Sequence, residues 1–124
     1  MGNNLRLSGK NALVTGGSTG IGFAVAQAFV DEGAQVVISG RTASTLDEAT
    51  KAIGSNCIAV KADVKSVKHI ESLFDTVSGH FEGLDIIVAN AGIASPVLMD
   101  ATTEALFDEM VMTNLKGTYF TVQK

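Results

Sequence analysis

Apolar residues along the chain follow two alternating patterns. Four short stretches are almost continuously apolar, as is typical of strands buried on both faces of a parallel sheet. These stretches are residues 11–15, 35–39, 57–62 and 84–89. Between and after them, apolar residues recur every three or four positions, which predicts helices. The predicted helices begin at Ile21, at Thr42 or Ser44, after a Ser66 cap, and at Thr102 or Thr103.

Helical spacing also predicts which side chains face the sheet. They are Ile21, Val25, Ala28 and Phe29 in the first helix, Leu46, Ala49 and Ile53 in the second, Val67, Ile70, Phe74, Val77 and Phe81 in the third, and Leu106, Met110 and Val111 in the last. The first helix is expected to stop at Gly33 and the second near Gly54. The last helix is expected to kink near Asn114.

Strands that alternate with amphipathic helices predict an α/β fold, a doubly wound Rossmann-like parallel sheet with helices on both faces. A glycine turn after the first strand predicts the strand order 3-2-1-4 for the part present, which ends after the fourth βα unit. The 124 residues are one domain at most. The fourth strand would have an open apolar edge, which invites pairing. We therefore expect that the chain is a fragment or that a second chain covers this edge.

The sequence TGGSTGIG at residues 15–22 links the first strand to the first helix. Such a turn directs backbone N–H groups and the positive end of a helix dipole at one point, which suits a phosphate or pyrophosphate. Gly16 would allow the tight turn, Gly20 a close approach of the backbone to the ligand, and Gly22 close packing of the helix on the strand. The spacing differs from G-x-G-x-x-G, and a turn without a ligand is the alternative.

Hydroxyl and guanidinium groups extend this candidate site. Ser18 and Thr19 could cap the helix or bond a phosphate. After the second strand comes Gly40-Arg41, without the acid that would bind the ribose 2′-hydroxyl of NAD. An arginine can hold the 2′-phosphate of NADP through forked, charge-assisted hydrogen bonds. NADP(H) is therefore favoured over NAD(H), and a solvated surface arginine is the alternative.

The third and fourth strands also end in polar groups. The Asp63 carboxylate could accept the adenine amino group and the Val64 N–H could meet a ring nitrogen, although Asp63 could also be an ordinary residue before a helix. In Asn90-Ala91-Gly92, the Asn90 amide could tie the loop to neighbouring strand ends, and Gly92 could bring backbone close to a ligand. A simple turn is the alternative there.

Together with Asn114-Leu115-Lys116-Gly117, these segments match in order and spacing the short-chain dehydrogenase/reductase family, which the sequence resembles over nearly its whole length. The resemblance implies that residues 15–22 bind the cofactor pyrophosphate and that Asn114, at a helix kink, holds a water of the proton relay. It also implies hydride transfer between nicotinamide and a ketone or secondary alcohol. The cofactor-binding residues expected on these grounds are Gly16, Ser18, Thr19, Gly20, Ile21, Gly22, Arg41, Asp63, Val64, Asn90, Ala91 and Gly92.

The sequence departs from the family in its catalytic set. Family members carry a Ser and a Tyr-x-x-x-Lys pair beyond the region matched here, whereas the only tyrosine here is Tyr119 and Gln123 stands four residues on. We expect Tyr119 to pack rather than to catalyse, so Asn114 is the only predicted catalytic residue. We interpret residues 1–124 as the N-terminal, NAD(P)-binding part of a longer domain. A truncated, non-catalytic nucleotide-binding module and an interaction module with an empty turn are the alternatives.

Composition and charge limit the kinds of partner, location and metal site that the chain could have. The net charge of −4 without a basic cluster argues against nucleic acid and anionic membranes as partners, and no apolar run approaches 18 residues. Cys57 is the single cysteine; we expect a buried structural thiol and a cytoplasmic location. Cys57, His69 and His80 lack a metal-ligand spacing. The resemblance implies a small-molecule carbonyl or alcohol substrate and a homo-oligomer, either a dimer or a tetramer.

Overall fold

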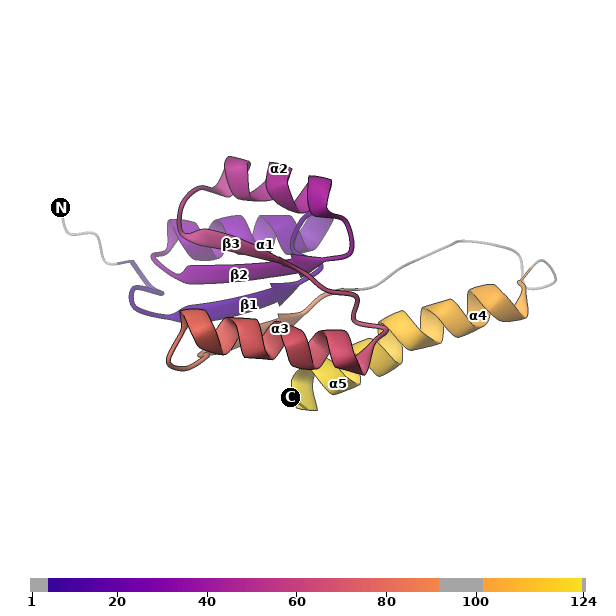
Figure 1. Cartoon of the computed structure of the whole chain (residues 1–124). Helices are drawn as coiled ribbons and strands as arrows, with labels where there is room; N and C mark the ends of the chain where they lie inside the picture. The colour runs from indigo at the N-terminus through magenta and orange to yellow at the C-terminus, as the bar shows by residue number, and fades with distance from the viewer. Residues whose placement is uncertain (1–4, 92–101, 124) are drawn as a thin grey trace.

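The computed structural model describes residues 5–91 and 102–123, and strands and helices alternate along them as predicted (Figure 1). The strands are β1 (Asn11–Thr15), β2 (Gln35–Gly40), β3 (Cys57–Lys61) and β4 (Ile86–Ala89). The helices are α1 (Gly20–Asp31), α2 (Ala43–Ile53), α3 (Val67–His80), α4 (Glu104–Val111), the π-helical segment η2 (Met112–Gly117) and α5 (Thr118–Gln123). None of these described helices is long and apolar enough to cross a membrane.

The four strands form one parallel sheet in the order β3-β2-β1-β4. Helices α1 and α2 cover one face, whereas α3 and α5 lie on the other (Figure 1). The prediction of a doubly wound, Rossmann-like arrangement is therefore confirmed. Parallel strands place all their carboxyl ends at one edge of the sheet, and this edge carries the candidate site.

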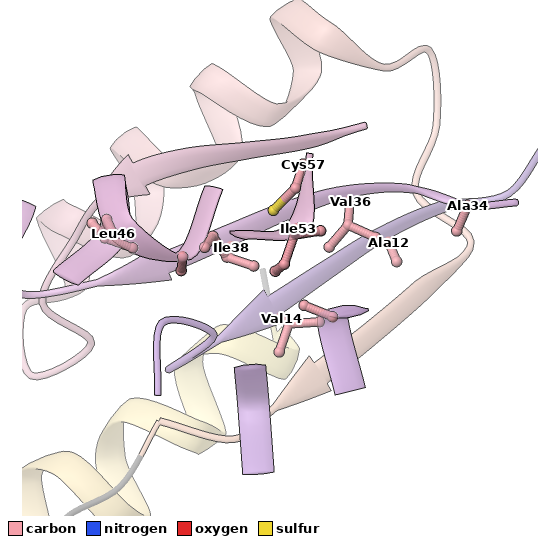
Figure 2. Close-up of a cluster of buried hydrophobic side chains, with 10 residues drawn as sticks. Ala12, Val14, Ala34, Val36, Ile38, Leu46, Ile53 and Cys57 are labelled. Atoms are coloured by element: carbon pink, nitrogen blue, oxygen red, sulfur yellow. The ribbon is translucent and has the colours of Figure 1, made fainter. Parts of the chain in front are cut away.

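The core lies on both faces of the two central strands. Ala12 and Val14 belong to a cluster shared with α1 and α2 (Figure 2). Leu13 and Val37 point to the opposite face, where they join a cluster that includes Leu73 of α3. Successive side chains of a strand alternate between faces, so a strand covered on both sides is apolar at every position. This is the physical origin of the continuous apolar runs.

The buried face of α1 differs from the predicted one. Ile21 is 75% exposed and Ala28 is also exposed, whereas Gly22 and Ala26 are buried. Gly22 packs directly on the carbonyl of Gly16, and this contact sets the rotation of the helix about its axis. Val25 and Phe29 pack against the core as predicted, so the predicted face is wrong at Ile21 and Ala28 only.

The helix ends follow the predicted caps in part. The Ser66 hydroxyl accepts a hydrogen bond from the His69 N–H at the start of α3. Thr103, one of two predicted starts, accepts a hydrogen bond from the Leu106 N–H at α4. Thr42 stands at the N-cap of α2 but makes no side-chain cap bond there.

Helix α4 extends past the carboxyl edge of the sheet (Figure 1), and this position explains one further correction. Val111 is exposed rather than inward, while Leu106 and Met110 are half-buried. Tyr119 of α5 is 61% exposed and packs edge-on against the ring of Phe120; that it packs rather than catalyses stays a prediction.

The kink predicted near Asn114 falls in η2, where a π-helical turn interrupts the helix. Gly117 of this segment is buried against the loop after β3: a Cβ atom there would lie 2.7 Å from Val64 Cγ2 and 2.8 Å from the Val64 carbonyl oxygen. The Thr121 hydroxyl donates to the Gly117 carbonyl at 2.7 Å. Helix and loop are thereby held in direct contact above the sheet edge.

Strand β4 lies at an edge of the sheet. Within the described residues it pairs with β1 alone, and Ile87 is 40% exposed. The predicted open edge is therefore present. That the chain is a fragment, or that a second chain covers this edge, stays a prediction.

We predict that the Cys57 thiol is unreactive in the folded protein. Burial raises the pKa of Cys57 to about 11, and the thiolate is the reactive form. Iodoacetamide should alkylate it slowly at about pH 8.5 and readily in urea, as measured by intact mass. Because folding disfavours the thiolate, the free energy of unfolding should fall as pH rises from the ordinary thiol range towards 11, and Cys57→Ala should remove that fall. Rapid alkylation of the native protein would contradict the burial.

We predict opposite effects of alanine at two helical glycines. Gly117→Ala should destabilise the protein by about 1–3 kcal/mol, because its Cβ would overlap Val64. Gly79→Ala in α3 is the matched control; its Cβ meets nothing within 4 Å, so it should stabilise by about 0.5–1 kcal/mol. Urea unfolding midpoints measure both changes. Equal shifts would refute the close contact between η2 and the Val64 loop.

Candidate functional site

A cavity of about 260 Å³ opens at the carboxyl edge of the sheet. Its walls come from the loops after β1, β2, β3 and β4 and from η2. The lining residues are Gly16, Ser18, Thr19, Ser39, Gly40, Arg41, Thr42, Thr45, Ala62, Asp63, Val64, Ala91 and Thr113. Seven predicted residues thus meet there, namely Gly16, Ser18, Thr19, Arg41, Asp63, Val64 and Ala91.

The remaining predicted residues lie outside this lining. Gly20, Ile21, Gly22 and Asn90 stand beside the turn, and Gly92 lies outside the described residues. Asn114 is exposed in η2 and is not among the lining residues. Its predicted catalytic role therefore stays a prediction.

The glycine turn depends on backbone conformations that other residues rarely adopt. Gly16 has φ +64° and Gly20 has φ +58°, both in the left-handed region. A Cβ on Gly20 would meet nothing within 4 Å, so the backbone is open to a ligand at that point. Gly17 is required for a different reason, because a Cβ added there would lie 2.6 Å from Ile38 Cγ2. The sequence reasoning missed this packing requirement.

The loops after β1 and β4 are joined by hydrogen bonds. The Thr15 hydroxyl accepts from the N–H groups of Asn90 at 3.0 Å and Ala91 at 3.2 Å. The Asn90 amide donates to the Gly16 carbonyl at 3.2 Å, which is the tie predicted for this side chain. A Cβ on Gly22 would clash with that carbonyl and lie 2.6 Å from Asn90 Nδ2. Gly22 therefore leaves the space in which this bond forms.

The start of α1 faces the cavity. Thr19 stands at the N-cap with extended backbone, and its side chain makes no cap hydrogen bond, so the capping role considered for it is not observed. The Ser18 hydroxyl accepts a long hydrogen bond from Thr45, at 3.5 Å. The first turn of α1 contains no acidic residue. The positive end of the helix dipole is therefore uncompensated by the helix's own side chains.

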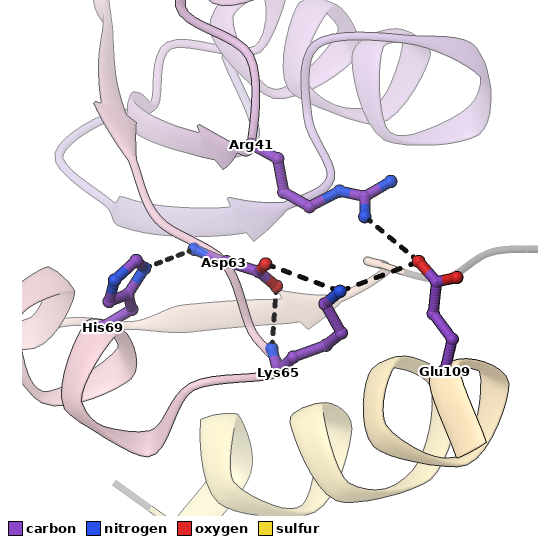
Figure 3. Close-up of polar contacts among 5 residues, drawn as sticks. All are labelled: Arg41, Asp63, Lys65, His69 and Glu109. Carbon is purple, nitrogen blue, oxygen red and sulfur yellow. Dashed lines mark hydrogen bonds and ion pairs between the residues drawn. The ribbon is translucent and has the colours of Figure 1, made fainter. Parts of the chain in front are cut away.

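The carboxylate of Asp63 organises the loop after β3. Its Oδ1 accepts from the Lys65 N–H at 3.0 Å, and its backbone N–H donates to His69 Nδ1 at 3.1 Å (Figure 3). Ser66 caps α3 as predicted, and Asp63 lies three residues before this cap. His69, an exposed residue of the first turn of α3, helps to hold this loop through its ring nitrogen.

A chain of opposite charges links the ends of β2 and β3 to α4 (Figure 3). Glu109 Oε1 on α4 lies 3.7 Å from Arg41 Nη1 and 3.6 Å from Lys65 Nζ. Lys65 Nζ lies 3.9 Å from Asp63 Oδ2. Arg41 is thus directed at other elements of the chain rather than only at solvent. The sequence reasoning missed Lys65 and Glu109, since no local pattern links two residues so far apart.

The described residues contain no group of three His, Cys, Asp or Glu side chains that could hold a metal ion. Cys57 is buried in the core, away from the cavity lining. The charged side chains of the cavity lining are those of Arg41 and Asp63, and backbone N–H groups and hydroxyls surround them.

Known proteins are similar to this chain in sequence and in architecture. The sequence model of the short chain dehydrogenase family matches residues 10–124. An oxidoreductase of Sarocladium schorii is 45% identical over 118 residues, which cover 95% of this chain and 47% of that protein. The NADP-dependent (R)-specific alcohol dehydrogenase of Lentilactobacillus kefiri is 41% identical over 117 residues, which cover 93% of this chain and 46% of that protein.

A solved short chain dehydrogenase of Bacillus anthracis superimposes with a TM-score of 0.89 at 30% identity, over 92% of this chain and 48% of its own. The chain spans about half the length of the relatives it matches. The family match covers most of the chain, and the strand order agrees with it. The chain therefore belongs to the short-chain dehydrogenase/reductase family.

Proposed function

We propose that this chain is the NADP(H)-binding part of an oxidoreductase that transfers hydride between nicotinamide and a ketone or secondary alcohol. The observation that carries the proposal is the cavity at the carboxyl edge, where the glycine turn, Arg41 and Asp63 meet. The turn and the start of α1 offer backbone N–H groups and a dipole to a pyrophosphate. The Asp63 carboxylate offers an acceptor to the adenine amino group.

The preference for NADP(H) rests on the end of β2. Arg41 lines the cavity, and no acid stands where it would bind the ribose 2′-hydroxyl. A Cβ on Gly40 would lie 3.4 Å from Ser18 Oγ, so a larger side chain would crowd the cavity. The name of the Lentilactobacillus kefiri relative, an NADP-dependent alcohol dehydrogenase, agrees with this preference.

Hydride transfer needs catalytic groups in addition to the cofactor-binding residues named above. Bound NADPH supplies the hydride, and we assign to Asn114 the water of the proton relay. The second candidate is a nucleotide-binding module without turnover, because the described site offers groups that bind a cofactor. Titration with NADPH tests cofactor binding, and carbonyl-dependent NADPH oxidation separates the oxidoreductase from the module. No binding of NADPH would refute both.

We also propose a small carbonyl or alcohol substrate, a cytoplasmic location and a homo-oligomer, either a dimer or a tetramer. Support for the oligomer comes from apolar side chains exposed along α4, η2 and α5, because contiguous exposed apolar surface marks contact sites. These side chains are Phe107, Val111, Met112, Leu115, Tyr119 and Val122.

Arg41→Asp should weaken NADPH binding by about tenfold or more, because it removes charge-assisted bonds to the 2′-phosphate and adds repulsion. The Kd of NADH, which lacks that phosphate, should change by less than about twofold. Calorimetric titration of both cofactors at low salt measures the difference. Lys10→Asp makes the same charge change at the opposite edge of the sheet and should affect neither cofactor. Equal losses for NADPH and NADH in Arg41→Asp would refute the assignment.

Glu109→Gln should strengthen NADPH binding by about two- to fivefold. The Glu109 carboxylate pairs with Arg41 and Lys65 and so competes with an incoming phosphate. NADH should bind equally well to the variant and to the parent protein. Asp108→Asn is the matched control, since it removes an exposed charge from the neighbouring position of α4. Weaker NADPH binding in Glu109→Gln would show that the carboxylate positions Arg41 instead of opposing the phosphate.

A further inference from the structure

Two buried hydroxyl groups at the cavity have no hydrogen-bond partner in the described part of the chain, those of Ser39 and Thr113. Ser39 is 1% exposed and Thr113 is 3% exposed, and both residues line the cavity. Buried hydroxyls in folded proteins are nearly always bonded, because an unbonded one has lost its hydrogen bonds to water. An unpartnered hydroxyl in a cavity wall therefore points to a ligand atom as its partner.

Thr113 is the more informative of the two because its helix offers a ready alternative. A threonine inside a helix commonly donates its hydroxyl to the carbonyl four residues earlier. Thr121, buried in α5, does so to the Gly117 carbonyl at 2.7 Å. Thr113 makes no such bond. Two buried threonines of the same helical stretch thus differ, and only the one in the cavity wall has an unbonded hydroxyl.

The position of Thr113 follows from the packing of η2. Gly117, at the end of η2, lies in direct contact with Val64, so the preceding turn is held over the loop after β3. That turn contains Thr113, which lines the cavity together with Asp63 and Val64. π-helical segments are frequent at functional sites. Here the segment places a hydroxyl in the same cavity lining as the residues that the proposed function assigns to the adenine.

We propose that the Thr113 hydroxyl forms a hydrogen bond with the adenine base of the bound dinucleotide. A hydroxyl both donates and accepts, so it complements the Asp63 carboxylate, which only accepts, along an edge that carries an amino group and ring nitrogens. This inference rests on the proposed binding of NADP(H). It adds to that proposal a base-binding residue on the helical wall, opposite the strand ends.

Thr113→Val tests the inference because it removes the hydroxyl and keeps the shape. The unliganded variant should have a higher Tm, since an unbonded buried polar group is lost. Its Kd for NADPH should nevertheless rise by about three- to tenfold. The Kd for 2′,5′-ADP, the adenosine half alone, should rise by the same factor. Thr113→Ser, which keeps the hydroxyl and removes only the methyl group, should bind both ligands with most of the parent affinity.

The matched control is Thr121→Val, which removes a bonded hydroxyl outside the cavity lining. It should lower the Tm and leave both Kd values within about twofold. An unchanged Kd in Thr113→Val, a loss confined to NADPH but not 2′,5′-ADP, or an equal loss in Thr113→Ser would each overturn the inference. If the parent protein binds neither NADPH nor 2′,5′-ADP, the proposed function itself fails.

Discussion

The close approach of α1 to the loop after β4 is the constraint on which the rest of the site depends. Gly22 has no side chain, so the Asn90 amide reaches the Gly16 carbonyl at 3.2 Å. This bond joins the two strands that flank the point where the order of the sheet reverses. Because the turn is fixed from both sides, the start of α1 is held with its N–H groups at the carboxyl edge. A larger residue at Gly22 would separate these loops.

A second constraint is electrostatic and is built from distant segments. Arg41 and Lys65 extend from the sheet side, and Glu109 meets both from α4. All three side chains are partly exposed, so the pairs contribute little to stability. Their importance lies in placement, because Lys65 and Glu109 set the charge around Arg41, which lines the cavity and is proposed to bind the phosphate.

The strand order, the glycine turn and the strand-end residues could be predicted because each has a local signature. Arg41 and Asp63 directly follow apolar runs, and parallel strands bring such positions together. Thr113 and Glu109 had no such signature. Their places depend on the contact between Gly117 and Val64, two residues of separate elements. Ile21 was misplaced for a similar reason, since a packing contact and not the helical period determines the rotation of α1.

The cavity thus has two walls with different physical demands. On the strand side, Gly16 lines the cavity with a positive φ, and Gly17 and Gly22 beside it are required by close packing, so most substitutions at these glycines would disturb the fold. On the helical side, the Thr113 hydroxyl makes no hydrogen bond within the described residues, and Glu109, which lies outside the lining, makes only weak surface pairs. Ligand preference can therefore change through the helical wall at little cost to stability, while the strand-end wall keeps the phosphate-binding geometry constant.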